Sequence, residues 1–316
     1  MTVVASGSVA FDYILTYAGR FRDHILADKA HVLNLSFLVE SLERRRGGVA
    51  VNYAYNLRLL GHPAAVLATA GHDGAEHKAW LESLGVDCRG LRLLEGELTA
   101  TGFTTTDLDD NQLTGYYGGA MYKAAQLGLQ DTVPEPAAVI VGPNAPSAIN
   151  RLAAECHERG VRLVFDPAFQ VKDLEPEDLV RGADGAWIVI GNDYEMELLA
   201  QRTGNPVEKL GADIVVTTFG RQGSRIAAGG ESHEIPAAPA RHEADPTGAG
   251  DAFRAGLVVG LLRGLDLPAA GRVAAVAASF AVEHVGTVEH FYTPPEFAAR
   301  FAEAFGAPLP TAFFAS

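Results

Sequence analysis

The chain has 316 residues, of which 48% are hydrophobic and 20% are charged, and 25 Lys and Arg against 39 Asp and Glu give a net charge of −14. This composition excludes a disordered chain or a collagen-like fibre. The acidic balance argues against sequence-independent nucleic-acid binding, which requires a basic face. Two cysteines, Cys88 and Cys156, are too few for a disulfide framework or a cysteine-rich zinc site.

The N-terminal segment and the apolar runs give no sign of membrane targeting. Residues 1–12 contain no basic stretch of the kind that opens a signal peptide. The apolar run from Ala255 to Leu262 ends at Arg263, well short of the ~18 residues that a membrane span needs. We therefore expect a soluble, cytoplasmic protein with no membrane and no nucleic-acid partner.

Short β-rich runs alternate with helical patterns along most of the chain, and several runs are apolar on both faces, as in a covered parallel sheet. The predicted strands are Val3 to Val9, Ala65 to Ala70, Ala138 to Gly142, Arg162 to Asp166, Trp187 to Gly191 and Ile214 to Thr218. The predicted helices are Ala50 to Leu60, Ala75 to Leu84, Ala145 to Glu158, Glu195 to Arg202, Ala252 to Leu262 and Ala269 to His284. The alternation predicts an α/β fold with a doubly wound, mostly parallel sheet.

Two segments, residues 13–40 and 98–117, break this alternation because each contains strand-like runs without a helix between them. The predicted strands in them include His31 to Leu38 and Thr99 to Thr106. We expect these segments to pair as a small β-sheet lid within a single domain of residues 1–316. Two edge hairpins without a function are the alternative.

The most specific motif is Asp245-Pro-Thr-Gly-Ala-Gly-Asp251, which stands immediately before a helical pattern. Gly248 and Gly250 let a phosphate approach the backbone, and the free N–H groups of a helix start, here from Gly248 through Ala249 to Gly250, form an anion site. A carboxylate at Asp251, beside that anion, is suited to accept the proton of an attacking hydroxyl. The alternative is a glycine-rich loop in which Asp251 merely caps the helix.

Three further motifs precede this one: Gly47-Gly48-Val-Ala-Val-Asn52, Asn192-Asp-Tyr-Glu195 and Thr218-Phe-Gly220-Arg-Gln-Gly223. Together, and in this order, the four motifs resemble the signatures of the ribokinase-like (PfkB) carbohydrate and nucleoside kinases. The resemblance covers essentially the whole chain. The segments 6–12 and 35–39 look most like the bacterial adenosine kinases of that family.

Several residues are candidates for binding the acceptor substrate. Asp12 follows the first strand, where open α/β sheets place ligands, and Gly48 and Asn52 stand where a helix begins, so the three suit vicinal sugar hydroxyls. Hydroxyl, amide and aromatic groups suited to a nucleoside base are offered by Ser8, Ser36, Gln170, Phe37, Phe103, Tyr116 and Tyr117. Alternatively, these aromatic side chains form the lid's own core or a dimer contact. Phe169 departs from the polar amides that adenosine kinases of this type carry.

The remaining motif residues are candidates for the nucleotide and its cations. The side chain of Asn192 and the Thr218–Gly223 turn, with Gly220, would approach the phosphates of ATP, and Glu195 would hold Mg²⁺ through water. A plain helix start at Asn192 with an exposed Glu195 is the alternative. The resemblance also implies a K⁺ site near residues 245–247 and 279–286. One arginine of the run 44–46, Arg46, is expected to neutralise the transferred phosphate, unless the run is only a solvated face.

These motifs together predict a kinase that phosphorylates the 5'-hydroxyl of adenosine from ATP and Mg²⁺, as a homodimer joined through the lid. A sugar kinase with the same motifs, such as a ribokinase or fructokinase, is the first alternative. A non-catalytic relative that only binds a nucleoside or sugar is the second. The presence of Asp251 between a helix start and two glycines weighs against the pure binder.

Overall fold

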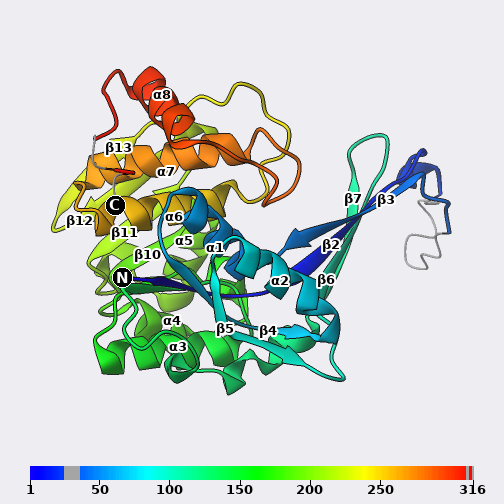
Figure 1. The fold of residues 1–316 in the computed structure, drawn as a ribbon, viewed down its shortest axis with the longest axis horizontal. Helices are drawn as coiled ribbons and strands as arrows, with labels where there is room; N and C mark the ends of the chain where they lie inside the picture. The colour runs from blue at the N-terminus through cyan, green and yellow to red at the C-terminus, as the bar shows by residue number, and fades with distance from the viewer. Residues whose placement is uncertain (25–35, 311–312, 315–316) are drawn as a thin grey trace.

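Two β-sheets organise the computed structural model, which describes residues 1–24, 36–310 and 313–314 (Figure 1). Among these residues the larger sheet has nine strands in the order β13-β12-β11-β10-β9-β8-β1-β4-β5. In chain order they are β1 (Val3–Ser6), β4 (Ala64–Gly71), β5 (Asp87–Leu94), β8 (Ala138–Val141), β9 (Leu163–Phe165), β10 (Ile188–Asn192), β11 (Ile214–Thr218), β12 (Ser224–Ala228) and β13 (Glu231–Ile235). All neighbours pair in parallel except β11–β12 and β12–β13.

Helices cover both faces of this sheet (Figure 1). One face packs on α1 (Val49–Leu59), α2 (Ala75–Ser83), α6 (Ala249–Leu262), α7 (Leu267–Ala281) and α8 (Pro294–Phe305). The other packs on α3 (Pro146–Arg159), α4 (Pro176–Ala183) and α5 (Asp193–Thr203). Along β1 the side chains of Val3 and Ala5 enter the first core and that of Val4 the second, which is why the strand is apolar throughout.

The predicted α/β fold is confirmed, and every predicted strand and helix of the large sheet is present with ends moved by a few residues. The elements that the sequence did not indicate are β5, β12, β13, α4 and α8. Of these, β5 and β13 are the edge strands of the sheet and β12 is next to an edge, and exposed charged side chains such as Arg89 on β5 and Arg225 on β12 obscure the apolar pattern. No helix in the described part of the chain is long and apolar enough to cross a membrane.

The smaller sheet has the order β3-β2-β6-β7 and projects from one side of the large sheet (Figure 1). Its strands are β2 (Ala10–Thr16), β3 (Ser41–Gly47), β6 (Ala100–Thr106) and β7 (Gln112–Tyr117). The two segments thus meet through the parallel pair β2–β6. Of the predicted strand His31 to Leu38, residues 31–35 lie outside the described residues and 36–38 are not in a strand. In its described part, the predicted segment 13–40 contains only the end of one strand, β2, and the second strand, β3, begins just after it; three consecutive arginines hide β3 in the sequence.

Candidate active site

The motif residues gather at the carboxyl ends of the large sheet's strands. The chain leaves β1 in one direction to β4 and β5 and later returns on its other side to β8, β9 and β10. This reversal makes the junction of β1 and β8 the topological switch point, where doubly wound sheets open a crevice for ligands. The Ser8 N–H donates to the Pro143 carbonyl oxygen at 3.0 Å, which holds the two strand exits together.

The predicted anion site lies at the start of α6. Gly248 has a φ of 83°, in the left-handed region, and a Cβ there would lie 3.0 Å from Cα of Thr287, so this turn requires glycine. The Ala249 N–H donates to Pro246 and the Ala252 N–H to Gly248. Among the described residues the amides of Gly250 and Asp251 have no backbone acceptor, and they remain available to an anion.

Asp251 lies on the first turn of α6 with its carboxylate against α1. Nδ2 of Asn52 donates to Oδ2 of Asp251 at 2.7 Å, an interaction between residues almost two hundred positions apart. Burial raises the pKa of Asp251 to about 6, although Arg254 and the Asn52 hydrogen bond act in the opposite direction. A carboxylate with such a pKa, whose Oδ1 accepts no hydrogen bond from the described residues, is suited to general-base chemistry near neutral pH.

Arg254 and Asp166 are part of this site and were missed by the sequence analysis. Nη2 of Arg254 donates to Oδ1 of Asp166 at 2.8 Å, Nε pairs with Oδ2, and the hydroxyl of Tyr53 donates to the same carboxylate. Oε2 of Glu195 lies 3.8 Å from Nη2 of Arg254. One signal in the sequence could have found this arginine: it is the only charged residue between Asp251 and Arg263 in an otherwise apolar helix.

The small sheet presents Asp12 to the same crevice. Asp12 pairs with Gly102, and Gly102 pairs with Tyr116, so all three share one face of the sheet. A Cβ on Gly47 would overlap the Asp12 carboxylate, and one on Gly102 would lie 2.9 Å from its Oδ1. Burial raises the pKa of Asp12. Burial also raises the pKa of Tyr116 to about 12, and the hydroxyl of Tyr116 lies beside Ser8. These contacts place Asp12 and Tyr116, two candidates for binding the acceptor substrate, side by side.

Gly48 and Ser8 lie where the small sheet joins α1. Gly48 has a φ of 94°, and a Cβ there would lie 2.5 Å from the Ser8 carbonyl oxygen. Oγ of Ser8 accepts from the Val49 N–H at 3.3 Å. The Ser8 hydroxyl therefore already accepts a hydrogen bond from the start of α1. Because Gly48 alone separates β3 from α1, Asn52 lies on the part of α1 that adjoins the small sheet.

Phe103 does not join this group. It pairs with Tyr13 and Gly115, one position along from Asp12 and Tyr116, and side chains alternate between the faces of a sheet. Its ring stacks on Tyr13 at a centroid distance of 5.2 Å, and 49% of the residue is exposed. The prediction that Phe103 and Tyr116 flank one base is therefore wrong for a single chain.

Of the three other predicted lid residues, Phe37 meets the alternative that the aromatic side chains form the lid's own core. The ring of Phe37 lies 4.6 Å from Tyr17 and 5.5 Å from Phe21, centroid to centroid, in an aromatic cluster of its own. Ser36 is exposed and makes no side-chain hydrogen bond to the described residues. Tyr117 pairs with Thr101, one position along from Tyr116, so its ring lies on the opposite face of the small sheet.

The arginine run reaches the site through a different member than predicted. Arg46 lies on the α2 side of the small sheet, with its guanidinium carbon 5.1 Å from the centroid of Trp80. Arg45, one position earlier and on the other face, donates from Nη1 to the carbonyl oxygen of Val285. Strand alternation places the two guanidinium groups on opposite faces of the small sheet, and the role expected of Arg46 at the phosphate stays a prediction.

The nucleotide-side motifs stand next to each other because β10 and β11 run in parallel, with Asn192 opposite Thr218. Gly220 and Gly223 follow in the turn that leads into β12. A Cβ on Gly223 would overlap the carbonyl oxygen of Ile235. The backbone of this turn therefore packs against the end of β13. Its glycines place no side chain over the end of β11.

Glu195 contacts both the start of its own helix, α5, and Arg254 on α6. Oδ1 of Asn192 accepts from the Glu195 N–H, and Oε2 of Glu195 accepts from the Asn192 N–H, both at 2.8 Å. This capping box matches the helix start of the alternative, but Glu195 is not exposed as that alternative expected. The carboxylate also faces Arg254 and is largely buried, and burial raises its pKa. No group of three His, Cys, Asp or Glu side chains within the described ranges is arranged to hold a metal, so a cation here would rely on water and on phosphate oxygens.

Gln170 lies in the short 3-10 helix that follows Asp166 at the end of β9. It is buried, while the neighbouring Phe169 is 54% exposed. The ring of Phe169 therefore points away from the core, and the amide of Gln170 takes the inward position on this segment.

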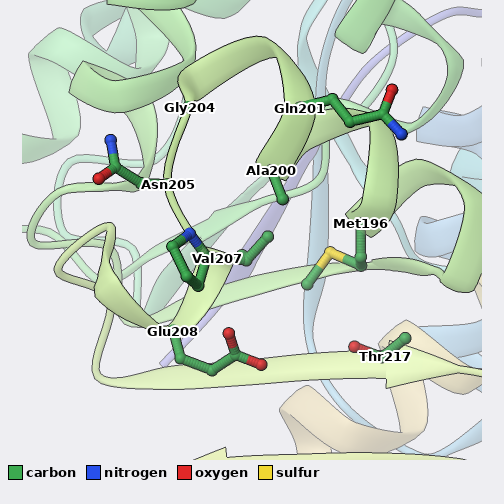
Figure 2. Close-up of a pocket in the computed structure, with 9 residues that line it drawn as sticks. Met196, Ala200, Gln201, Gly204, Asn205, Val207, Glu208 and Thr217 are labelled. Carbon is green, nitrogen blue, oxygen red and sulfur yellow. The ribbon is translucent and has the colours of Figure 1, made fainter.

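A cavity of about 610 Å³ lies between α5 and β11 (Figure 2). Met196 of α5 and Thr217 of β11 face it, and Val207 and Glu208 lie on its other side. None of the predicted site residues lines it. Thr217 and Thr218 are consecutive on a strand and point to opposite faces, so the cavity belongs to the α5 side of the sheet.

Comparison with known proteins agrees with the geometry. The model of the pfkB carbohydrate kinase family matches residues 8–293. The nucleoside kinase of Methanothermobacter thermautotrophicus is 32% identical over 311 residues, covering 96% of both chains. The structure of Burkholderia thailandensis nucleoside kinase in complex with inosine aligns with a TM-score of 0.87 at 34% identity, covering 98% of this chain and 99% of that one. The ADP-inosine complex of the same kinase gives 0.85 at 35% identity, covering 98% and 97%.

Proposed function

We propose a function from the premise that this chain belongs to the pfkB family of carbohydrate kinases. It is a kinase of the nucleoside and sugar type, and the proposed reaction transfers the γ-phosphoryl group of ATP to the 5'-hydroxyl of a nucleoside, with adenosine as the preferred acceptor. The observation that carries this proposal is the juxtaposition of Asp251 with the free amides of its own helix start and with Asn52.

Asp251 is assigned the proton transfer. Asn52 occupies Oδ2, which leaves Oδ1 to accept the proton of the 5'-hydroxyl. The hydroxyl oxygen then bonds to the γ-phosphorus as the bond to the ADP oxygen breaks. The amides of Gly250 and Asp251 donate to the phosphoryl oxygens and stabilise the charge that develops on them.

The small sheet is assigned the acceptor. Asp12, with two glycines packed against its carboxylate, would accept hydrogen bonds from ribose hydroxyls, and Tyr116 would lie against the base. A purine is supported by the similar kinase whose structures hold inosine. A sugar acceptor is the second candidate. It is favoured because Phe103 lies on the opposite face of the small sheet from Tyr116, so only one of these two aromatic rings is placed to contact a base.

Glu195 and Asn192 fit the proposed role at Mg²⁺, because the largely buried carboxylate of Glu195, on the first turn of α5, lies 3.8 Å from Arg254 on the helix whose start would receive phosphate. Bound there, Mg²⁺ would supply positive charge to the phosphates of ATP. A K⁺ site fits less well. Both oxygens of Asp245 already accept from the amides of Thr247 and Gly286, and Arg45 donates to Val285 in the same loop.

A homodimer joined through the small sheet remains part of the proposal. No strand among the described residues pairs with the outer edges of β3 and β7, and the sheet exposes apolar side chains, namely Leu42, Phe103, Leu113 and Tyr117. Exposed edges and apolar surface of this kind are normally covered. Sedimentation velocity across the micromolar range tests this point: a monomer throughout would contradict it. A cytoplasmic location stays a prediction.

An acceptor panel in a coupled assay of ADP formation tests the proposed function. Adenosine, inosine, ribose and fructose are compared at equal ATP and Mg²⁺, with thermal shifts for each acceptor alone. The proposal expects the highest kcat/KM for adenosine. A higher value for ribose or fructose would replace it by the sugar kinase, and thermal shifts without any ADP formation would favour the non-catalytic binder.

A further inference from the structure

Arg254 lies one helical turn after Asp251 on α6. Side chains on a helix lean toward its N-terminus, so the guanidinium of Arg254 lies back over the turn that forms the anion site. A Cβ placed on Gly250 would stand 2.6 Å from Nη1 of Arg254. Gly250 therefore makes room for this guanidinium, in addition to any room that it makes for a phosphate.

Buried partners from two other elements hold Arg254 in this position. Asp166, at the end of β9, binds it through both carboxylate oxygens, with 7% of Arg254 and 1% of Asp166 exposed. The hydroxyl of Tyr53 on α1 donates to the same carboxylate of Asp166. Nη1 of Arg254 makes no hydrogen bond to the described residues, although Nη2 does.

The charges around Asp251 are predominantly negative. Besides Asp251 itself, the carboxylates of Asp166 and Glu195 act on it, and both favour its protonated form. Arg254 is the cation that opposes them, while the neighbouring Asn52 and Tyr53 carry no charge. Burial alone would lower the pKa of Arg254, but Asp166 holds it above its ordinary value, so the guanidinium stays charged.

We infer that Arg254 is a positioning residue that keeps Asp251 ionised and offsets the acidic wall of the site, so that an anionic phosphoryl group can enter. Nothing in the motif pattern assigns it this role. Its consequence for turnover rests on the proposed function, but its effect on the charge of Asp251 does not.

The direct test is a titration of Asp251 by carbon NMR of ¹³C-carboxyl-labelled aspartate, with Asp251→Asn to assign the resonance. In Arg254→Gln the midpoint is expected to rise by about one pH unit or more. The acid limb of kcat/KM should move with it, because a one-unit rise lowers the ionised share at pH 6 from about half to about a tenth, a roughly fivefold loss. Arg254→Lys, which keeps the charge, should restore most of the midpoint.

A matched control separates this role from simple loss of a buried ion pair. Arg300 and Glu283 form a pair that is equally buried, and Arg300→Gln should reduce the free energy of unfolding without moving the Asp251 midpoint. A folded Arg254→Gln with the wild-type midpoint would overturn the inference.

A second variant keeps the test decisive if Arg254→Gln does not fold. The double variant Asp166→Asn/Arg254→Gln removes both charges of the pair and leaves no unpaired buried charge. Because Arg254 acts on Asp251 more strongly than Asp166 does, the Asp251 midpoint should still rise, and a midpoint that stays or falls would overturn the inference. If the wild-type enzyme transfers phosphate to no acceptor, the proposed function fails, and these titrations still decide the role of Arg254.

Discussion

The two sheets differ in how they are covered and in what they bring to the site. Helices pack on both faces of the large sheet, whose central strands are fully buried. The small sheet presents one face to the crevice and leaves much of the other exposed. The large sheet thus fixes the groups assigned to chemistry, and the small sheet carries those assigned to choosing the acceptor.

Burial raises the pKa of a carboxylate beside each sheet, that of Asp251 near the large sheet and that of Asp12 on the small one. The helix α1 joins them, because it begins directly after β3 and Gly48 and carries Asn52 to Asp251. Substitutions on the two sides should therefore separate kcat from KM, and the following experiments test that separation.

The largest effect is expected from Asp251→Asn. Loss of the general base should lower kcat by about 10²–10⁴-fold, and the loss should be similar for every acceptor because the proton transfer is common to all. Initial rates with isothermal titration of ATP and acceptor measure it, with the exposed Asp173→Asn as the control. A variant that keeps more than about a tenth of the wild-type rate would remove Asp251 from this role.

On the small sheet, Gly47→Ala should act on the acceptor. The new methyl group would overlap the carboxylate of Asp12 and displace it from the ribose hydroxyls. Loss of charge-assisted hydrogen bonds of about 1.5–3 kcal/mol raises KM roughly 10- to 100-fold, with a smaller change in kcat. Gly115→Ala on β7 is the control, because no atom lies within 4 Å of its Cβ position. An equal fall of kcat in Gly47→Ala and Gly115→Ala would contradict the predicted separation of kcat and KM between the two sheets.

The difference between the sheets also explains what the sequence could predict. In the large sheet, burial on both faces imposes apolar strands, and Ile214–Thr218 was predicted at its observed bounds. In the small sheet, β3 reads Ser-Leu-Glu-Arg-Arg-Arg-Gly and carries no such pattern. Motif glycines identified the anion site, but which face Phe103 or Arg46 occupies depends on register, which a sequence does not show. The Arg254–Asp166 pair joins segments 88 positions apart and was missed for the same reason.

Register also predicts that two aromatic side chains on the small sheet behave differently. Tyr116→Ala removes the ring beside Asp12 and should raise KM for adenosine about tenfold, within the 1–3 kcal/mol of one stacked base. Phe103→Ala removes a ring that stacks on Tyr13 and should leave this KM within about twofold, because the base keeps its stacking on Tyr116. Steady-state kinetics with adenosine and ribose measure both. If Phe103→Ala selectively weakens adenosine, its ring must reach a base, possible only through a second chain of a dimer.

The smallest effect concerns monovalent cations near the anion site. The resemblance predicts that K⁺ raises activity, yet the guanidinium of Arg45 already donates to the carbonyl of Val285, close to Asp245. Since a partly exposed ionic contact contributes up to about 1 kcal/mol, exchanging K⁺ for tetramethylammonium at constant ionic strength should change the wild-type rate by at most about fivefold. Arg45→Met should make the enzyme more dependent on K⁺, because the loop then lacks its fixed cation. Equal rates in both salts for both enzymes would discard a cation site beside Asp245, whereas a strong K⁺ requirement in the wild type would show that Arg45 does not replace the ion.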